Sequence, residues 1–448
     1  MEKPKVRISV RNLVEFILRS GDLDNSRGSS GDKEAMLKGG RLHRKIQRSM
    51  KGNYQAEVSL KRESEYEDVI IQVEGRADGI FTEDGEFWID EIKGTYGNLQ
   101  AMEVPVPVHR AQAMCYGWIY GEKEGLSQIG IQMTYSHLDT EDTRRFREIF
   151  SMEELKNWYQ KLLDDYHKWI SCSLSWKKER NASMKDLQFP FPYREGQREI
   201  VSGVYHTVSS KKTLFVQAPT GVGKTMSAIF PSVRAIGEGK GETLFYLTAK
   251  TITGTVAWEA FHTLRENGLK FKVTAITAKE KLCFLDSPEC TPEKCPYAKG
   301  HFDRVNDAVY ELWTTEEVYS REVIRAHAEK WQVCPFEMCL DLSVWVDGVI
   351  CDYNYAFDPN VHLKRFFGEN ISGDYIFLID EAHNLVERGR EMYSAEISRQ
   401  TLFTLRKKIR KHFPKLARAL DKASRQMLEL EEDLKASQNP YQVLSNPG

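Results

Sequence analysis

Short apolar runs separated by helical stretches characterise the sequence after about residue 190. The runs cover residues 213–217, 243–248, 271–276, 346–351 and 375–379. Continuous apolar runs of this length are typical of strands that are buried on both faces of a sheet. Because the runs alternate with helical patterns, this region is predicted to form a parallel, doubly wound α/β sheet. Residues 283–340 interrupt the alternation, and residues 393–436 are helical and charged.

The part of the chain before this region shows a different pattern. Strands are expected near residues 57–62, 69–73, 87–92 and 129–136, and helices up to residue 50 and at 109–120 and 152–170. This mixture predicts an α/β domain with a small sheet. The polar stretch 20–32 is expected to be a mobile loop. The expected domains are 1–172, a linker at 173–189, a second domain at 190–392 and a helical region at 393–448.

Composition narrows the functional classes. The net charge of −2 gives no bulk attraction to nucleic acid, so a DNA site would depend on local patches. No apolar run reaches the roughly 20 residues of a membrane span, and the N-terminus lacks a signal-peptide core. A cytoplasmic protein with no membrane partner is therefore expected. Six of the eight cysteines lie between Cys283 and Cys351, which indicates metal or redox chemistry rather than disulfides.

A glycine-rich string at residues 218–225 is the strongest candidate binding site. It reads A-P-T-G-V-G-K-T, the ending of a P-loop, with Pro-Thr in place of the usual first glycine. A strand before the loop and a helix after it would let backbone N–H groups hold a triphosphate. Lys224 would then reach the β- and γ-phosphates and Thr225 would bind Mg²⁺. The remaining loop residues expected to contact ATP are Thr220, Gly221, Val222 and Gly223.

An acidic pair, Asp380 and Glu381, follows the last apolar run in the string D-E-A-H, far beyond Thr225 in the sequence. Carboxylates at the end of a core strand suit a Mg²⁺ site of the Walker B type. Asp380 would hold Mg²⁺ through water, and Glu381 would orient or deprotonate the attacking water. A solvated acidic turn is the alternative.

A second acidic constellation lies near the N-terminus, where Asp78 precedes Glu91-Ile92-Lys93. Glu91 and Lys93 share one face of a strand. Asp78 and Glu91 could hold Mg²⁺ or Mn²⁺, and Lys93 could position or activate water for phosphodiester cleavage. E-x-K also occurs often on solvated strand faces.

Further residues before and after this constellation complete a motif series that resembles a known family. In sequence order the motif residues are Gly39, His43, Asp78, Glu91, Lys93, Gln112 and Tyr116. The series G-x-x-x-H, D, E-x-K and Q-x-x-x-Y, over residues 8–170, resembles the RecB-type branch of the PD-(D/E)xK nucleases. The resemblance implies a restriction-endonuclease-like fold in which the histidine and both carboxylates bind metal and the lysine is catalytic. The glutamine and tyrosine would support the site and DNA. A capping or core role for His43 and an ordinary buried Tyr116 are the alternatives.

Some members of that branch hold an iron–sulfur cluster in this domain. Cys115 and Cys172 are too few for one and are expected to be ordinary buried thiols.

The second domain carries two more elements with family parallels. An aromatic approach followed by Arg194-x-x-Gln197 resembles the adenine-reading element of superfamily 2 helicases, although these residues could instead start a helix. Residues 248–251, T-A-K-T, resemble a helicase element that contacts the DNA backbone.

The cysteines point to a subfamily. By spacing alone, the two C-x4-C pairs that start at Cys290 and Cys334 could form a zinc site. The strings Cys334-Pro-Phe and Cys351-Asp-Tyr-Asn-Tyr resemble the XPD/DinG helicases, which implies a [4Fe–4S] cluster in an insert at about 280–342. The implied ligands are Cys283, Cys290, Cys295 and Cys334. Cys339 remains an alternative to Cys290.

The resemblance extends to the expected function. It implies a RecA-like, P-loop domain at 190–392 with the cluster insert, and the start of a helical arch from 393. A second RecA-like domain is not in the sequence, so the chain is expected to bind ATP but not to translocate unless a partner chain supplies that domain. The expected protein is an ATP-dependent 5′–3′ helicase in DNA repair, acting on single-stranded or forked DNA and joined to a nuclease. The alternative is an ATP-switched DNA-binding scaffold.

Overall fold

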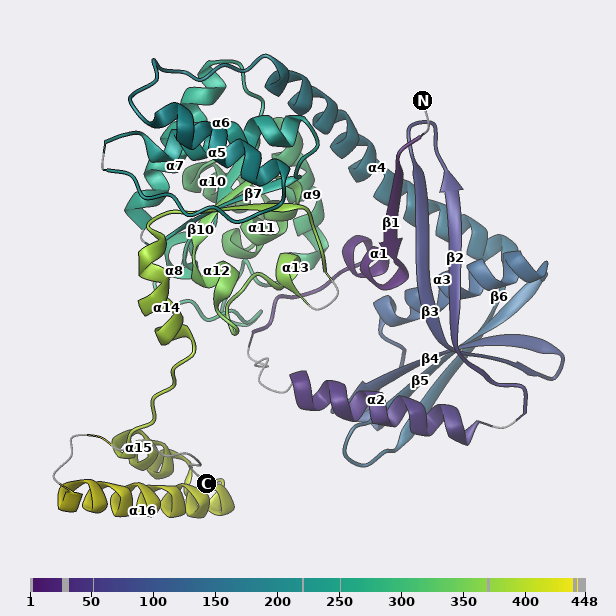
Figure 1. The fold of residues 1–448 in the computed structure, drawn as a ribbon. Coiled ribbons are helices and arrows are strands. Elements are labelled where there is room, and N and C mark those ends of the chain that lie inside the picture. Colours follow the sequence, from purple (N-terminus) through teal and green to yellow (C-terminus); the bar gives the residue numbers. More distant parts are fainter. Residues whose placement is uncertain are drawn as a thin grey trace. The chain divides into compact units, whose positions relative to one another are not determined.

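The computed structural model describes residues 3–25, 32–50, 52–219, 221–249, 251–368, 371–437 and 441. The chain divides into two compact units (Figure 1). The first contains the residues up to Asp352 together with Leu363–Glu381, and the second contains Tyr353–His362 and the residues from Ala382 onward. In the part of the chain that is described, no helix is both long and apolar enough to cross a membrane. Positions 26–31 of the loop expected at 20–32 lie outside the described residues.

The first unit begins with a mixed sheet of six strands in the order β1-β3-β4-β5-β6, with β2 paired to β3. The strands are β1 (Lys5–Ser9), β2 (Gln55–Glu65), β3 (Ile70–Glu83), β4 (Glu86–Thr95), β5 (Gln128–His137) and β6 (Thr143–Ser151). The β1–β3 and β4–β5 pairs are parallel and the other pairs are antiparallel. The prediction that this region contains a small sheet is therefore confirmed.

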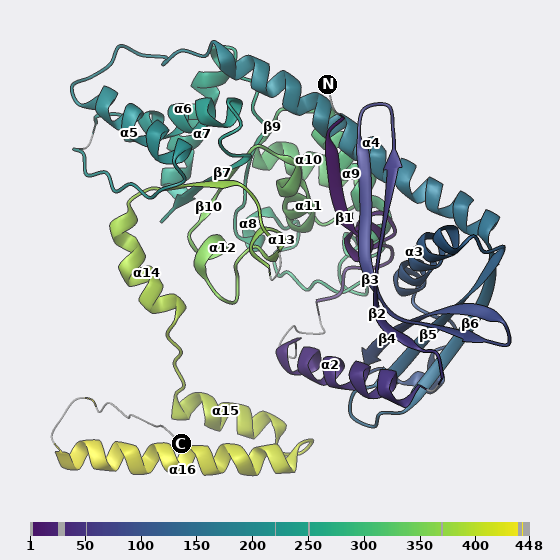
Figure 2. The same ribbon diagram turned by 45° about the vertical axis from the view of Figure 1, so that its right-hand side comes forward.

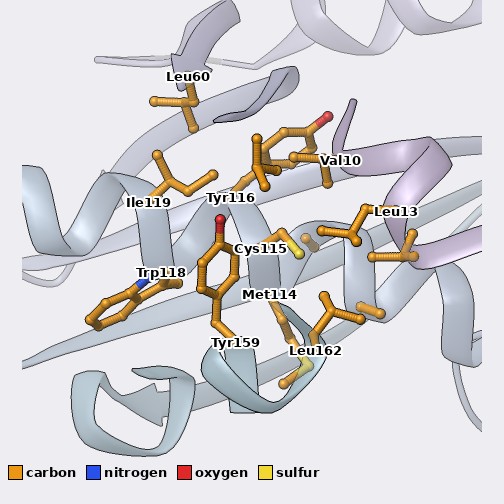
Figure 3. Packing of buried hydrophobic residues seen from close by; sticks show 14 of the residues in the cluster. Val10, Leu13, Leu60, Met114, Cys115, Tyr116, Trp118, Ile119, Tyr159 and Leu162 are labelled. Atoms are coloured by element: carbon orange, nitrogen blue, oxygen red, sulfur yellow. The ribbon is translucent and has the colours of Figure 1, made fainter. Parts of the chain in front are cut away.

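Four helices accompany this sheet: α1 (Val10–Ile17), α2 (Asp32–Ser49), α3 (Pro107–Glu124) and α4 (Met152–Lys185), with a short 3₁₀ turn η1 (Leu99–Ala101). Proline at the first position of α3 and a left-handed Gly125 at its end match the preferences of helix termini. Side chains from α1, α3 and α4 form the core beside the sheet (Figure 3). Cys115 lies inside this core as predicted, whereas Cys172 is only half-buried and hydrogen-bonds Tyr310.

Residues 173–189, expected to be a linker, are helical as far as Lys185. A capping box at Ser151 and Glu154 starts α4, which then continues for 34 residues. Figures 1 and 2 show it as one continuous helix that reaches from the first sheet to the second. The charged run is helical because its residues are paired: Arg180, 4% exposed, donates to Asp347 at 2.7 Å. Trp176 donates to the same carboxylate at 2.9 Å.

The second sheet is parallel, with five strands in the order β11-β7-β10-β8-β9 among the described residues. The strands are β7 (Thr243–Thr248), β8 (Val273–Ala275), β9 (Val318–Tyr319), β10 (Gly348–Asp352) and β11 (Tyr375–Ile379). The helices α5 (Gln197–Ser209), α6 (Lys224–Gly237) and α7 (Thr251–Glu266) precede or interleave with them. The predicted parallel sheet is confirmed for four of its five predicted strands.

The fifth predicted strand, residues 213–217, is not formed. This segment has no regular structure, and Leu214, Phe215 and Val216 are exposed. Strand propensity produces a strand only where a neighbour pairs with it and covers its side chains. At one end of the sheet order, the edge strand β11 also leaves Phe377 and Ile379 exposed.

The cysteine-rich insert separates β8 from β10. It contains α8 (Lys279–Leu282), α9 (His301–Thr315), α10 (Arg321–Trp331), α11 (Pro335–Leu342) and the 3₁₀ turn η2 (Ser343–Trp345). The short helix α13 (Lys364–Phe367) follows β10 in the first unit.

The second unit is helical. It contains α12 (Asn354–Phe357), η3 (Ala382–Asn384), α14 (Leu385–Met392), α15 (Arg399–Ile409) and α16 (Pro414–Ser437). Helices α15 and α16 are joined by the ion pairs Arg399–Glu431 at 2.9 Å and Arg406–Asp421 at 2.8 Å. The sequence predicts helices over residues 393–436, and the compact unit also includes the earlier residues 353–362 and 382–392.

Candidate functional site

The N-terminal constellation converges on one end of the first sheet. Lys93, on β4, places Nζ 2.8 Å from Oε1 of Glu91 and donates to Oε1 of Gln112 on α3 at 2.9 Å. Asp78, on β3, places Oδ1 3.6 Å from Nδ1 of His43 on α2. Two strands and two helices thus bring together side chains that are far apart in the sequence.

Tyr116 completes the group from one turn beyond Gln112. A Cβ atom at Gly75 would lie only 2.7 Å from its hydroxyl, so glycine at this point of β3 makes room for the ring. Burial, followed by the charges of Glu91 and Asp78, raises the pKa of Tyr116. Tyr116 is therefore buried, as expected for an ordinary core tyrosine, but it also lies next to the two carboxylates.

Glu91 is the most perturbed acid of this cluster. Burial, and then the negative charge of Asp78, raise its pKa from 4.5 to about 7 despite the opposing charges of Lys93 and His43. Its second oxygen, Oε2, is buried and has no hydrogen-bond partner. An orphaned carboxylate oxygen beside a second carboxylate and an imidazole is a donor set that suits Mg²⁺ or Mn²⁺. Across the described residues, however, no three His, Cys, Asp or Glu side chains form a group ready to hold a metal ion.

Further polar residues that the sequence pattern did not identify lie near this cluster. Gln47 lies one turn after His43 on α2 and donates to the backbone carbonyl of Asp78 at 3.0 Å. His109, at the start of α3, places Nδ1 3.2 Å from the Tyr135 hydroxyl. Burial, then the charge of Lys93, lowers the pKa of His109 to about 4, so this imidazole is neutral at pH 7. The i, i+4 spacing of His43 and Gln47 was the one available signal.

The phosphate-loop residues lie at the start of α6. Gly221 and Gly223 both adopt left-handed backbone angles, with φ of 83° and 82°, and helix α6 begins at Lys224. Lys224 Nζ donates to the carbonyl of Ala218 at 3.0 Å. Thr220 lies outside the described residues, as does Lys250 of the expected DNA-backbone element. The predicted loop followed by a helix is therefore present, but the strand predicted before the loop is not formed.

Arg194 and Gln197 both contact this loop. Gln197 accepts from the Arg194 backbone N–H at 3.0 Å and donates to the carbonyl of Val222 at 3.0 Å. Arg194 donates from its guanidinium to the carbonyl of Gly221. A Cβ atom at position 223 would lie 2.7 Å from Nε2 of Gln197, so the loop needs glycine there to pack against the glutamine. Both predicted residues are thus placed beside the loop, where their polar groups bind its backbone.

The acidic pair reaches the same loop through a tyrosine. The backbone N–H of Asp380 donates to the carbonyl of Leu247 at 2.9 Å, which holds the end of β11 beside β7. The Tyr246 hydroxyl lies 3.4 Å from Oγ1 of Thr225 and hydrogen-bonds the Asp380 side chain. Burial, then the charge of Glu381, raises the pKa of Asp380. Glu381 is exposed and has a left-handed φ of 50°.

Tyr246 was not identified from the sequence. It is 2% exposed within β7. A hydroxyl inside an otherwise apolar strand run was the signal, because a buried Tyr O–H usually finds a polar partner.

The four cysteines expected to bind a cluster line one cavity of the insert. They are Cys283, Cys290, Cys295 and Cys334. Cys339 does not reach it: its sulfur is 3.7 Å from the Thr274 hydroxyl and donates to the carbonyl of Ala275. Burial raises the pKa of Cys334 to about 11, so a metal that binds the thiolate would offset a large cost of deprotonation. All eight cysteines of the chain are free thiols.

One comparison with known proteins locates a family match within the chain. Residues 264–402 match the DEAD_2 family model. This DEAD_2 segment runs from α7 into α15 and includes the cysteine-rich insert, β10, β11 and Asp380 with Glu381.

Three relatives are helicases by description. The chain is 40% identical over 201 residues to a probable ATP-dependent helicase of Methanocaldococcus jannaschii, covering 44% of this chain and 29% of that protein. It is 23% identical over 261 residues to a Caenorhabditis briggsae homolog of regulator of telomere elongation helicase 1, covering 48% and 26%. It is 22% identical over 255 residues to the Arabidopsis thaliana XPD helicase subunit of general transcription and DNA repair factor IIH, covering 49% and 33%.

These similarities support an XPD-type helicase relationship for this part of the chain. The chain spans a third or less of the length of these curated relatives.

Proposed function

We propose that the second half of the chain is the nucleotide-binding part of an ATP-dependent DNA helicase of the XPD type. The observation that carries this proposal is the link between Thr225 at the start of α6 and Asp380 at the end of β11 through Tyr246. A P-loop hydroxyl and a strand-end carboxylate that share one partner are placed to bind the same Mg²⁺. The match of the DEAD_2 segment and the helicase relatives support the same assignment.

The chain's residues then have distinct tasks. Lys224, now on the carbonyl of Ala218, would exchange that oxygen for β- and γ-phosphate oxygens when ATP binds. Thr225 and Asp380 would hold Mg²⁺, and the exposed Glu381 would orient or deprotonate the attacking water. Arg194 and Gln197 hold the loop by donating hydrogen bonds to its carbonyls. From the same position they would bind the adenine of ATP. The 5′–3′ polarity and single-stranded or forked DNA as substrate follow from the resemblance to the XPD/DinG helicases.

We propose further that the four cavity cysteines hold a [4Fe–4S] cluster. The supporting observation is that Cys283, Cys290, Cys295 and Cys334 share one cavity while Cys339 is engaged elsewhere. A cluster of this kind requires four thiolates, and the cavity offers four. The cluster would cross-link α8, the following loop and the start of α11. Zinc is the competing occupant, and metal analysis distinguishes the two.

A second candidate function, nuclease activity, has its own observation. Glu91 presents a buried, unpartnered oxygen next to Asp78 and His43, and Lys93 donates a hydrogen bond to the Gln112 side chain. We propose that Mg²⁺ or Mn²⁺ binds to the two carboxylates and His43, and that Lys93 positions the attacking water. When bound, the metal would stabilise charge on the cleaved phosphodiester.

One experiment tests the helicase proposal directly. ATP hydrolysis by the full chain is measured with and without single-stranded DNA, in wild type and in Asp380→Asn. Where a second motor domain is present, in the same chain or in a partner chain, we expect DNA to stimulate ATP hydrolysis by wild type. Asp380→Asn should abolish this hydrolysis. DNA binding that ATP alters without any hydrolysis would instead favour the ATP-switched scaffold.

A further inference from the structure

Residues 21–25, which follow α1, contact the cysteine-rich insert. The backbone N–H of Leu23 donates to the carbonyl of Ala298 at 2.8 Å, and the N–H of Asn25 donates to the carbonyl of Cys290 at 2.9 Å. In the opposite direction, the N–H of Phe302 donates to the carbonyl of Gly21 at 3.0 Å. Backbone hydrogen bonds therefore join positions 21–25, called the N-terminal strap below, to a part of the chain that is distant in the sequence.

Two aspartates reinforce this contact reciprocally. Oδ1 of Asp22, in the strap, accepts from the N–H of Gly300 at 2.6 Å. Oδ1 of Asp303, in the insert, accepts from the N–H of Gly21 at 2.8 Å. Each side thus caps a backbone donor of the other, and charged acceptors make stronger hydrogen bonds than neutral ones.

The strap is anchored at its base. Arg19 forms an ion pair with the buried Asp341 at 2.7 Å and donates to Asn306. Asn306 in turn donates to the carbonyl of Phe16 at 2.6 Å. Helix α1, which precedes Arg19, buries Val10 fully in the core of the first sheet (Figure 3). The strap is therefore held at its N-terminal end by these contacts.

Leu23 is the strap residue that reaches the cysteines. Its side chain is 6% exposed and packs in one apolar cluster with Cys295, Ala298 and Cys334. It also lines the cavity that the four cysteines share. A leucine from the N-terminal region thus closes a cavity whose other lining residues belong to the insert.

We propose that the N-terminal strap is the lid of the four-cysteine site, so that the nuclease-like region controls solvent access to the group those cysteines hold. The inference rests on the proposed cysteine-held group. An apolar shell around a metal site limits the entry of water and chelators and thereby sets how readily the metal is lost. Because the contacts are mutual, loss of the bound group is also expected to loosen the strap.

The test compares Leu23→Asp with Leu37→Asp, which introduces the same charge at a leucine of α2 that is 66% exposed. Protein purified without oxygen is exposed to an iron and zinc chelator, and release is followed by absorbance. We expect release from Leu23→Asp to be at least tenfold faster than from wild type, and release from Leu37→Asp to be unchanged. The milder Leu23→Ala, with its fold checked by circular dichroism, replaces Leu23→Asp if the latter misfolds.

A second readout follows the strap itself rather than metal release. Hydrogen exchange at the amides of Gly21, Leu23 and Asn25 is compared in wild type and Cys334→Ser. Exchange at least tenfold faster in Cys334→Ser supports the lid. Equal release rates for wild type and the Leu23 variants, from protein that carries stoichiometric metal, would refute the lid but leave the four-cysteine site intact. Wild-type protein without stoichiometric iron or zinc would refute the site itself and the lid with it.

Discussion

Lys93 and Glu91 form an ion pair of 2.8 Å on one face of β4, while the other oxygen of Glu91 is buried without a partner. A structural ion pair would be expected to satisfy both carboxylate oxygens, because an unpaired buried acceptor costs about 1–3 kcal/mol. The arrangement instead leaves one oxygen available to a ligand and a lysine beside it. This relationship is the basis of the nuclease assignment.

Replacement of Lys93 tests that assignment. We expect Lys93→Ala to lower metal-dependent cleavage of single-stranded DNA by at least about 100-fold, the usual contribution of a group that assists proton transfer. Lys123→Ala is the matched control, since Lys123 is 70% exposed in its side chain and pairs with its neighbour Glu124. Cleavage by Lys93→Ala at the wild-type rate, or no cleavage by wild type with any divalent metal, would contradict the assignment.

The raised pKa of Glu91 predicts how stability depends on pH. Because its pKa is about 7 in the folded protein and 4.5 when unperturbed, the folded state binds more protons than the unfolded state between these values. Glu91 therefore contributes up to about 3 kcal/mol to the free energy of unfolding below pH 4.5. This contribution is lost as the pH rises through 7. Urea unfolding with a chelator present, from pH 5 to 8, should show this slope in wild type and a smaller slope in Glu91→Gln. Identical slopes would contradict it.

The cysteine cavity gives a paired prediction. Cys334→Ser should lose the bound metal, because its sulfur lines the cavity. Cys339→Ser should retain it, because Cys339 is buried against Thr274 and Ala275 instead. The measurement is iron, zinc and acid-labile sulfide per chain after anaerobic purification. Retention by Cys334→Ser together with loss in Cys339→Ser would reverse the ligand assignment.

Helix α4 should depend on its buried ion pair. Arg180→Ala leaves Asp347 buried without its guanidinium partner, and loss of one member of such a pair typically costs about 3–5 kcal/mol. Lys177→Ala, nearly one turn earlier, removes an exposed pair with Glu242 and should cost less than about 1 kcal/mol. Urea denaturation of the two variants measures both values. Equal, small effects would show that the α4–Asp347 contact does not hold the helix.

Much of the fold could be predicted from the sequence, because most of the apolar runs do form buried strands. β7 and β11 have the bounds that their apolar runs predicted, residues 243–248 and 375–379. Residues 213–217 have the same kind of run but form no strand, because pairing depends on tertiary neighbours that a local pattern does not contain. Residues 173–185 look like a linker because they are charged, and only the distant Asp347 explains why Arg180 is buried in a helix.

The candidate sites show the same limit. Motif spacing identified Glu91, Lys93 and Gln112, which do lie in contact. It did not identify Tyr246, whose role depends on Thr225 and Asp380, residues that come together only in the folded sheet. The contact of Leu23 with the cysteine cavity had no local signal at all, since its partners Cys295 and Cys334 are distant in the sequence.

Equilibrium binding is the decisive test of whether Lys224, Thr225 and Asp380 form a site for Mg²⁺-ATP. Titration of wild type, Lys224→Ala and the exposed control Lys212→Ala with a fluorescent ATP analogue and Mg²⁺ gives three dissociation constants. We expect saturable binding by wild type and Lys212→Ala, with affinity at least about tenfold weaker in Lys224→Ala, a loss of about 1.4 kcal/mol or more. Equal affinities in all three proteins, or no binding by wild type, would contradict it.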